Sequence, residues 1–309
     1  MSKIYAIIVT YNRRALLEVC LKALAAQTRQ PDRILLLDNA STDDTQAWIQ
    51  ASGWADGKRH VYARLAENSG GAGGFTEGMR RAFAEDVDAV WMMDDDAEPE
   101  AGSLEKLLKV YEADTDGNTN IYGSIAITHG DGRFCWPLVS SDGKLFETVD
   151  QVPDKVAVAV LPFLGILIPR GVVDRNGYPD PGYFIQGDDA EFCHRARLNG
   201  MHVYAAGRSR LRHPASEFYR FGFGIAKPFC FRMPPWKRYY EVRNRILSTR
   251  RHSGLARVFF IVMPANVFRL TGSLLNEPQK AKQFLAFVAG TVDGLLLRKG
   301  KRHQNWHLA

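Results

Sequence analysis

The sequence predicts an α/β fold in which a mostly parallel β-sheet is flanked by helices on both faces. Over residues 4–94, short runs rich in β-branched residues alternate with stretches of helical periodicity, which is typical of consecutive β-α-β units. Each run is followed by a polar residue, and these residues are Thr10, Asp38, Asn68 and Asp94. Because ligands of such sheets bind beyond the carboxyl ends of the strands, these positions predict where the site lies.

The first half of this β-α-β pattern contains two buried strands. Ile4–Thr10 is a continuous apolar run, as expected of a strand that is covered on both faces. Leucines at helical spacing predict a helix over residues 14–26, and Arg33–Leu37 is the second buried strand. Ser41-Thr42-Asp43-Asp44 is typical of a helix start and predicts a helix over residues 43–51.

The second half repeats the pattern and then becomes irregular. Val61–Leu65 is the third predicted strand, glycine-rich residues 68–74 open a helix that runs to residue 84, and Ala89–Met93 is the fourth strand. Further on, we predict helices over 100–112 and 188–199, strands within 121–128, 156–168 and 203–205, and helices over 236–251, 255–271 and 279–297.

Composition and charge divide the chain near residue 207. The 309 residues are 46% hydrophobic and 24% charged, which fits a globular protein with a core and excludes a disordered chain or a small disulfide scaffold. Residues 207–309 hold 20 Lys and Arg against 4 Asp and Glu, whereas residues 1–206 hold 20 against 30. We therefore predict a domain over 1–206 and a basic helical region over 207–309, with different partners.

Cysteine usage and hydropathy predict a cytoplasmic protein. The four cysteines form no C-x-x-C pair, as expected of reduced thiols. The N-terminal apolar run is shorter than a signal peptide requires, and the apolar run Val258–Ala265 lies between Arg257 and Arg269. We therefore expect neither a signal peptide nor a membrane-spanning helix.

The triplet Asp94-Asp95-Asp96, directly after an apolar strand, is the strongest candidate for a site. Three adjacent carboxylates repel one another, and a hard cation such as Mn²⁺ or Mg²⁺ relieves the repulsion through oxygen ligands. A solvated acidic turn is the alternative. The position at the end of a buried strand favours the metal site.

A second acidic cluster, Gly187-Asp188-Asp189-Ala190-Glu191, opens the helix predicted over 188–199. Acidic residues also occur at helix starts because the helix dipole favours them. If both clusters face one cleft, one can hold a cation while the other supplies a general base. The glycine-rich residues 68–74 can bring backbone N–H groups to a phosphate or sugar, although a flexible turn has the same composition.

Other motifs are absent or open to two interpretations. Asp38 can accept a hydrogen bond from a base edge or belong to a turn, and His213 can ligate a metal or lie in a surface loop. No G-x-S-x-G, H-E-x-x-H or Walker A motif occurs. The basic C-terminal region carries no nucleic-acid-binding motif, so we expect no nucleic-acid partner.

Taken together, the motifs and their order resemble the family 2 inverting glycosyltransferases of the GT-A fold, and within them bacterial galactofuranosyltransferases. The resemblance covers residues 3–250. It rests on Ile8–Arg13, Leu37–Asp43, Glu67–Gly71, Trp91–Asp96, Gly165–Arg170, Gly187–Arg195, His213, Tyr239-Tyr240 and Arg243-Asn244.

The resemblance implies a role for each candidate residue. Asp189 would be the catalytic base, with Asp188 beside the acceptor or donor sugar. Asp94, Asp96 and His213 would hold Mn²⁺ or Mg²⁺. The donor-binding set would be Thr10, Asn12, Arg13, Asp38, Asn68, Gly71, Asp95 and Trp136. Residues 1–206 would form the catalytic domain.

The implied reaction transfers galactofuranose from UDP-galactofuranose to a hydroxyl of a growing bacterial surface glycan. Transfer of rhamnose or another sugar is the alternative within the family, and a catalytically silent nucleotide- or glycan-binding protein is the alternative outside it. The basic helices would lie on the inner face of the cytoplasmic membrane, next to a lipid-linked acceptor. A helical subdomain or an oligomer contact would explain the same composition.

Overall fold

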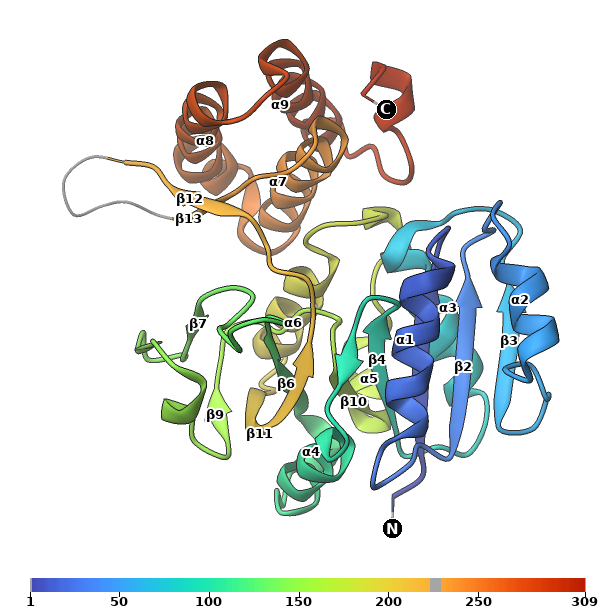
Figure 1. The fold of residues 1–309 in the computed structure, drawn as a ribbon. Helices are drawn as coiled ribbons and strands as arrows, with labels where there is room; N and C mark the ends of the chain where they lie inside the picture. The colour runs from blue at the N-terminus through green and yellow to red at the C-terminus, as the bar shows by residue number, and fades with distance from the viewer. Residues whose placement is uncertain (1, 223–228, 309) are drawn as a thin grey trace. The chain divides into compact units, whose positions relative to one another are not determined.

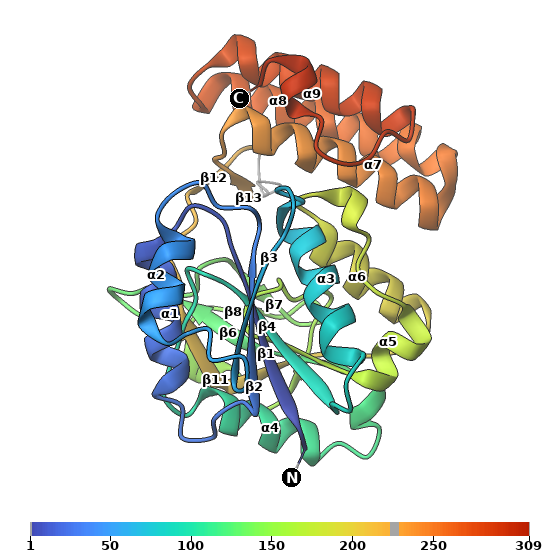
Figure 2. The same cartoon turned by 90° about the vertical axis from the view of Figure 1, so that its right-hand side faces the viewer.

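The computed structural model describes residues 2–222 and 229–308. The chain forms two compact units (Figures 1 and 2): a first unit of residues 1–180 and 192–215, and a second unit of residues 181–191 and 216–309. The boundary expected between residues 206 and 207 falls inside strand β11, Val203–Arg212. The division into a catalytic domain 1–206 and a basic region 207–309 stays a prediction.

The first unit contains a mixed, mainly parallel sheet in the order β3-β2-β1-β4-β10-β6-β11-β5, with β9 beside β11. Strands β3, β2, β1 and β4 are parallel, as are β6 and β11, whereas β10 is antiparallel to β4 and β6. The predicted fold class is confirmed. The strand bounds are β1 Ile4–Thr10, β2 Arg33–Asp38, β3 His60–Arg64, β4 Ala89–Asp94, β5 Glu98–Pro99, β6 Ile121–Ile127, β9 Val156–Ala157 and β10 Ile166–Pro169.

Strand β1 is buried along its whole length because helices cover both faces of the sheet. Its even-numbered residues pack with Leu17 and Leu21 of α1 (Arg14–Ala25), whereas its odd-numbered residues pack with Phe75 and Met79 of α3 (Gly70–Phe83). Figure 2 shows α1 and α3 on opposite sides of the strands. Burial of both faces explains the continuous apolar sequence of β1.

Two glycines allow α3 to approach β1 closely. A Cβ atom on Gly74 would lie 2.6 Å from Val9 Cγ1, and one on Gly78 would lie 2.5 Å from Ile7 Cγ2. Any larger residue would therefore push the helix away from the sheet. Part of the glycine-rich pattern thus reflects packing between a helix and a strand.

The second unit is built from three long helices and a short hairpin in its described part. Helix α7 covers Pro235–Arg257, α8 covers Met263–Asn276, α9 covers Lys280–Leu295, and β12 (Phe218–Arg220) pairs with β13 (Phe229–Phe231).

The remaining elements of the two units are α2 Thr45–Ser52, α4 Ser103–Glu112, α5 Arg170–Asn176, α6 Asp188–Leu198, β7 Leu138–Val139, β8 Leu145–Phe146, η1 Gly117–Thr119, η2 Val149–Gln151, η3 Pro181–Tyr183, η4 Val258–Val262 and η5 His303–Trp306.

Helices α7 and α9 pack closely and share a buried carboxylate. A Cβ atom on Gly290 would lie 2.6 Å from the carbonyl oxygen of Tyr239. The side chain of Asp293 is fully buried and accepts hydrogen bonds from the Tyr239 hydroxyl at 2.7 Å and from Trp306 Nε1 at 3.0 Å. This network ties the C-terminal residues to the helix pair.

The helical stretch Pro235–Asn276 is long and apolar enough to cross a membrane, judged by length and composition alone. Of its most apolar window, 28% is buried within the protein. The helices predicted over 236–251 and 255–271 are separated near Gly254, where φ is 81° and ψ is 171° and the backbone is not helical. Pro264 lies in the first turn of α8, where a missing N–H is tolerated.

Candidate active site

The carboxyl ends of β2, β1 and β4 bring together the polar residues that the sequence places after these strands. Thr10 is paired with Asp38 across β1 and β2, and Val9 is paired with Asp94 across β1 and β4. Parallel pairing therefore gathers these strand ends at one edge of the first unit, where α/β proteins bind ligands.

An arginine bridges two of the three adjacent aspartates. Arg13 Nη1 lies 3.2 Å from Asp95 Oδ1 and 2.9 Å from Asp96 Oδ2. The Thr10 hydroxyl donates a hydrogen bond of 2.7 Å to Asp95 Oδ2. The Asp95 side chain is only 3% exposed, so these contacts supply partners that a buried carboxylate requires. The structure thus connects four of the predicted site residues.

His213 joins the same cluster although it lies more than one hundred residues further along the chain. It directly follows β11, and its backbone N–H donates to the carbonyl oxygen of Ile127 at 2.9 Å. Its Nε2 lies 3.4 Å from Asp96 Oδ1, and its ring centroid lies 5.9 Å from that of Trp136. His213 is therefore a neighbour of the acidic triplet, and Trp136, which only the family resemblance assigned, lies next to His213.

The pKa values of this cluster reflect burial and crowded negative charge. Burial, together with the charges of Asp96 and Asp95, raises the pKa of Asp94 well above its usual value. Burial also raises the pKa of Asp95 to about 6, against the opposing effect of Arg13. Burial lowers the pKa of His213, but its interaction with Asp96 outweighs this effect and raises that pKa to about 10. Additional positive charge would therefore be favourable here.

Part of the predicted metal set fits a divalent cation. Asp96 Oδ1 is buried and accepts no hydrogen bond from the described residues, yet it faces the imidazole nitrogen of His213. An unsatisfied carboxylate oxygen beside an imidazole is suited to Mn²⁺ or Mg²⁺. Within residues 2–222 and 229–308, no three His, Cys, Asp or Glu side chains are grouped closely enough to hold an ion. The full set Asp94, Asp96 and His213 stays a prediction.

Asp38 is fully buried and well satisfied at the end of β2. Its Oδ1 accepts a hydrogen bond of 2.7 Å from the backbone N–H of Ser41, and its Oδ2 accepts one of 2.6 Å from the Tyr62 hydroxyl. Burial and this contact with Asp38 raise the pKa of Tyr62 above its usual value. Tyr62 was missed by the sequence reasoning, since an alternating residue in a strand carries no sign of such a contact. The contact of Asp38 with uracil stays a prediction.

Asn12 and Asn68 shape the loops around this edge. The Asn12 side-chain oxygen accepts a hydrogen bond of 2.6 Å from the backbone N–H of Thr42, and that of Asn68 accepts one of 2.8 Å from Gly70. Gly71 lies in the first turn of α3, where an added Cβ would meet only ordinary contacts. The roles of Asn12, Asn68 and Gly71 in donor binding stay predictions.

Asp188 and Asp189 begin α6 in the second unit. Asp189 Oδ1 accepts a hydrogen bond of 2.7 Å from the backbone N–H of Ala190. Burial and the charge of Asp189 raise the pKa of Asp188 to about 8, and burial raises the pKa of Asp189 to about 6. Burial and their shared charge therefore make loss of both protons from this pair unfavourable. Since the two acidic clusters belong to different units, the prediction that they face one cleft stays a prediction.

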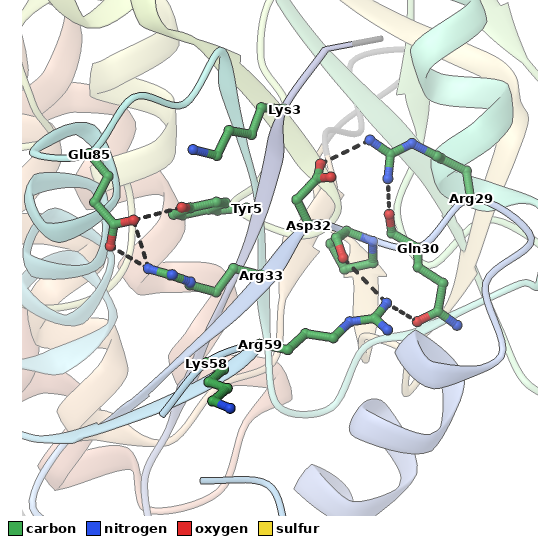
Figure 3. A pocket seen from close by; sticks show the side chains of 10 residues that line it. Lys3, Tyr5, Arg29, Gln30, Asp32, Arg33, Lys58, Arg59 and Glu85 are labelled. Atoms are coloured by element: carbon green, nitrogen blue, oxygen red, sulfur yellow. Dashed lines mark hydrogen bonds and ion pairs between the residues drawn. The ribbon is translucent and has the colours of Figure 1, made fainter. Parts of the chain in front are cut away.

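A groove of about 600 Å³ lies at the opposite edge of the sheet, where β1 to β3 begin. Figure 3 shows two ion pairs among its side chains, Arg33 with Glu85 at 2.5 Å and Arg29 with Asp32 at 2.9 Å. The Tyr5 hydroxyl also donates to Glu85, at 2.7 Å. The groove lies where the strands begin, away from the carboxyl ends at which α/β proteins bind ligands, so we assign it no part in the site.

The sequence is similar to those of known glycosyltransferases. The profile of the glycosyl transferase family 2 matches residues 5–167. Galactofuranosyltransferase GlfT1 of Mycolicibacterium smegmatis is 28% identical over 250 residues, which are 78% of this chain and 80% of that protein. GlfT1 of Mycobacterium tuberculosis strain H37Rv is 28% identical over 258 residues, or 79% and 81% of the two chains. The dTDP-rhamnosyl transferase RfbF of Shigella flexneri is 23% identical over 303 residues, or 95% and 96%.

Two solved structures share the fold at low sequence identity. The GalNAc-T7 structure with UDP, GalNAc and Mn²⁺ has a TM-score of 0.62 at 12% identity, over 96% of this chain and 57% of that one. The structure of S. aureus TarS residues 1–349 with UDP has a TM-score of 0.55 at 14% identity, over 95% and 81% of the two chains. With the family profile matching more than half of its residues, the chain belongs to glycosyltransferase family 2 and has the GT-A fold.

Proposed function

We propose that this glycosyltransferase transfers galactofuranose from UDP-galactofuranose to a hydroxyl of a bacterial surface glycan, with inversion at the anomeric carbon. The observation that carries the proposal is the cluster at the carboxyl edge of the sheet, where Arg13, Asp96 and His213 meet. The choice of sugar is supported by the similarity to two mycobacterial proteins named galactofuranosyltransferase GlfT1.

The proposed reaction is a single displacement. Asp189 accepts the proton of the acceptor hydroxyl, the hydroxyl oxygen bonds to the anomeric carbon, and the bond from that carbon to UDP breaks with its electron pair leaving on the diphosphate. Asp38 and the backbone near Thr10 would bind uracil, and Asp95 would contact the ribose or the diphosphate. A cation held by Asp94, Asp96 and His213 would offset the negative charge of the diphosphate.

A rhamnosyltransferase is the second candidate, because the match to RfbF extends over nearly the whole of both chains. The two candidates differ in the nucleotide as well as in the sugar. They can therefore be separated by the nucleoside diphosphate that the enzyme releases.

A donor panel tests the proposed activity. We expect the purified protein with Mn²⁺ and a lipid-linked glycan acceptor to release UDP from UDP-galactofuranose about tenfold faster than from UDP-galactopyranose or UDP-N-acetylglucosamine. The measurement is enzyme-coupled detection of the nucleoside diphosphate. Faster release of dTDP from dTDP-rhamnose would establish the rhamnosyltransferase instead. Binding of UDP without turnover of any donor would identify a catalytically silent nucleotide-binding protein.

We further infer that α8 contacts the inner face of the cytoplasmic membrane. Val267 and Leu275 of α8 are 61% and 67% exposed, and Phe260 of the preceding π-helical segment η4 is 79% exposed. The spacing of eight residues puts Val267 and Leu275 on one side of α8. The region 207–309 that contains this apolar face holds 20 Lys and Arg against 4 Asp and Glu. An apolar helix face in a basic region is suited to an anionic lipid surface.

Vesicle flotation tests this contact. We expect the triple variant Phe260→Ser, Val267→Ser, Leu275→Ser to bind vesicles of anionic phospholipid about tenfold or more weakly than the wild type, because apolar area no longer enters the lipid. The matched control is Leu16→Ser with Val19→Ser, which removes exposed apolar side chains from α1. Unchanged flotation of the triple variant would contradict the inference, as would a wild-type dimer that the triple variant turns into a monomer without any effect on flotation.

A further inference from the structure

The segment that leads to Asp188 and Asp189 has an unusual backbone. Phe184, Gln186 and Gly187 have φ angles of 65°, 68° and 79°, in the left-handed region. Glycine adopts this region easily, whereas a bulky residue such as phenylalanine does so only when its surroundings hold it there. Something in the second unit must therefore hold residues 182–187 in this conformation.

Asn244 of α7 supplies the contacts that this backbone needs. Its Nδ2 lies within hydrogen-bond distance of three carbonyl oxygens, those of Tyr183 at 3.0 Å, Ile185 at 2.9 Å and Gln186 at 2.7 Å. The side chain is 1% exposed, so water does not compete for these carbonyls. One amide group thus binds the backbone on both sides of each strained residue.

Arg243 fixes the orientation of that amide and holds the start of the segment. Its Nε donates to Asn244 Oδ1 at 2.9 Å, which turns the Asn244 nitrogen toward the loop. Its Nη2 donates to the carbonyl oxygens of Gly182 at 3.1 Å and Tyr183 at 2.8 Å. The guanidinium is fully buried and lies 4.7 Å from the centre of the Tyr240 ring, so it is held rigidly in place.

The same helix also holds the chain just after Asp189. The Glu191 side chain is buried and accepts a hydrogen bond of 2.8 Å from Nε2 of His252. Asn244 and His252 are eight residues apart on α7, about two helical turns. Helix α7 therefore contacts the chain on both sides of the acidic pair, within the second unit.

We propose that Arg243 and Asn244 are positioning residues that set the direction of the Asp189 carboxylate by holding residues 182–187 in their left-handed conformation. The inference rests on the proposed function, in which Asp189 is the base. It adds a role for two buried side chains that need no contact with the donor or the acceptor. A carboxylate that is displaced by about 1 Å from its productive place loses on the order of 10² in rate.

The test combines loop exchange with kinetics in Asn244→Ala. We expect hydrogen exchange of the amides in residues 182–191 to become about tenfold faster, and kcat to fall about 10- to 100-fold with the KM for the donor unchanged. The double variant with Gln186→Gly should have a kcat about fivefold higher than Asn244→Ala alone. Glycine adopts a positive φ without the energetic cost that the Asn244 hydrogen bonds offset at Gln186. A merely structural role of Asn244 in helix packing would give no such rescue.

Asn266→Ala is the matched control. Asn266 is also buried and accepts a hydrogen bond from an arginine of α7, Arg245, but it belongs to α8. We expect it to leave exchange in residues 182–191 unchanged. If Asn244→Ala fails to fold by circular dichroism, Asn244→Ser carries the same test with a shorter polar side chain.

The outcomes separate this inference from the proposed function. Faster exchange in Asn244→Ala together with rescue by Gln186→Gly supports the positioning role. Unchanged exchange and unchanged kcat overturn it. If Asp189→Asn keeps full activity while Asn244→Ala still loosens the loop, the hold on the loop stands but the assignment of the base, and with it the catalytic purpose of that hold, is overturned.

Discussion

Replacing Asp189 with asparagine is expected to lower kcat by about 10²- to 10⁴-fold, the range that a general base supplies. The KM for the donor should change little, since Asp189 acts on the acceptor hydroxyl. Single-turnover measurement of UDP release checks this result. The closest control is Asp188→Asn, which should lose less than about tenfold. Burial and the neighbouring charge raise the pKa of Asp188, so a neutral amide at that position replaces a carboxyl whose ionised form is disfavoured.

The same assignment predicts the acid limb of the pH profile. Burial raises the pKa of Asp189 to about 6, and a base works only when ionised. The value of kcat/KM should therefore fall as the pH drops through about 6, approaching a tenfold loss per pH unit, and level off above it. Asp174→Asn, a change at an exposed acid on α5, should keep this profile. Wild-type activity in Asp189→Asn with an unchanged acid limb would show that another group removes the proton.

Removal of divalent cations is expected to abolish sugar transfer, with a loss of about 10² or more that added Mn²⁺ restores. The buried Asp96 Oδ1, which accepts no hydrogen bond from the described residues and lies 3.4 Å from His213 Nε2, motivates this expectation. Asp96→Asn and His213→Ala should each weaken Mn²⁺ binding, measured by titration calorimetry with UDP present. Circular dichroism after exhaustive chelation serves as the control for folding.

The predicted metal site also implies that the affinity for Mn²⁺ increases with pH. The interaction with Asp96 outweighs the effect of burial and raises the pKa of His213 to about 10, so the imidazole holds a proton when no cation is present. A ligand must lose that proton, and Mn²⁺ affinity should rise by up to about tenfold per pH unit below this pKa. Full activity after exhaustive chelation, or Mn²⁺ affinity that does not depend on pH in this range, would argue against His213 as a ligand.

Local patterns predicted the strands of the first half because these strands are buried on both faces. Ile4–Thr10 was predicted with its observed bounds, and the ends of β2 and β4 differ by one residue from the prediction. The antiparallel direction of β10 could not be predicted, since pairing direction depends on partners distant in the sequence. Thr10, Asp38 and the acidic triplet were found through their position at strand ends.

Strand β11 was predicted too short, and this error concerns the site. The sequence reasoning ended it at Ala205, whereas it continues to Arg212 with an irregular register between Ala206 and Arg210. Its outward-facing arginines are paired with acidic residues, Arg208 with Asp154 at 2.8 Å among them. The alternation typical of a strand is thus present up to Arg212, but the arginines on its outward face make the segment look unlike a buried strand. The role of Asn244 could not be found in this way, because it depends on contacts with backbone atoms of a separate segment.

Residues 181–191 belong to the second unit, although the residues on either side of them in the sequence belong to the first. This arrangement limits how the enzyme can be divided into fragments. The family profile ends at residue 167, and the strands and helices that it covers belong to the first unit. The proposed proton acceptor, Asp189, owes its conformation to α7, which begins only at Pro235. A fragment that ends with β11 at Arg212 would therefore keep Asp189 in its sequence but lose α7, which holds the segment before it. Exchange of C-terminal helices between relatives would for the same reason alter turnover as well as targeting.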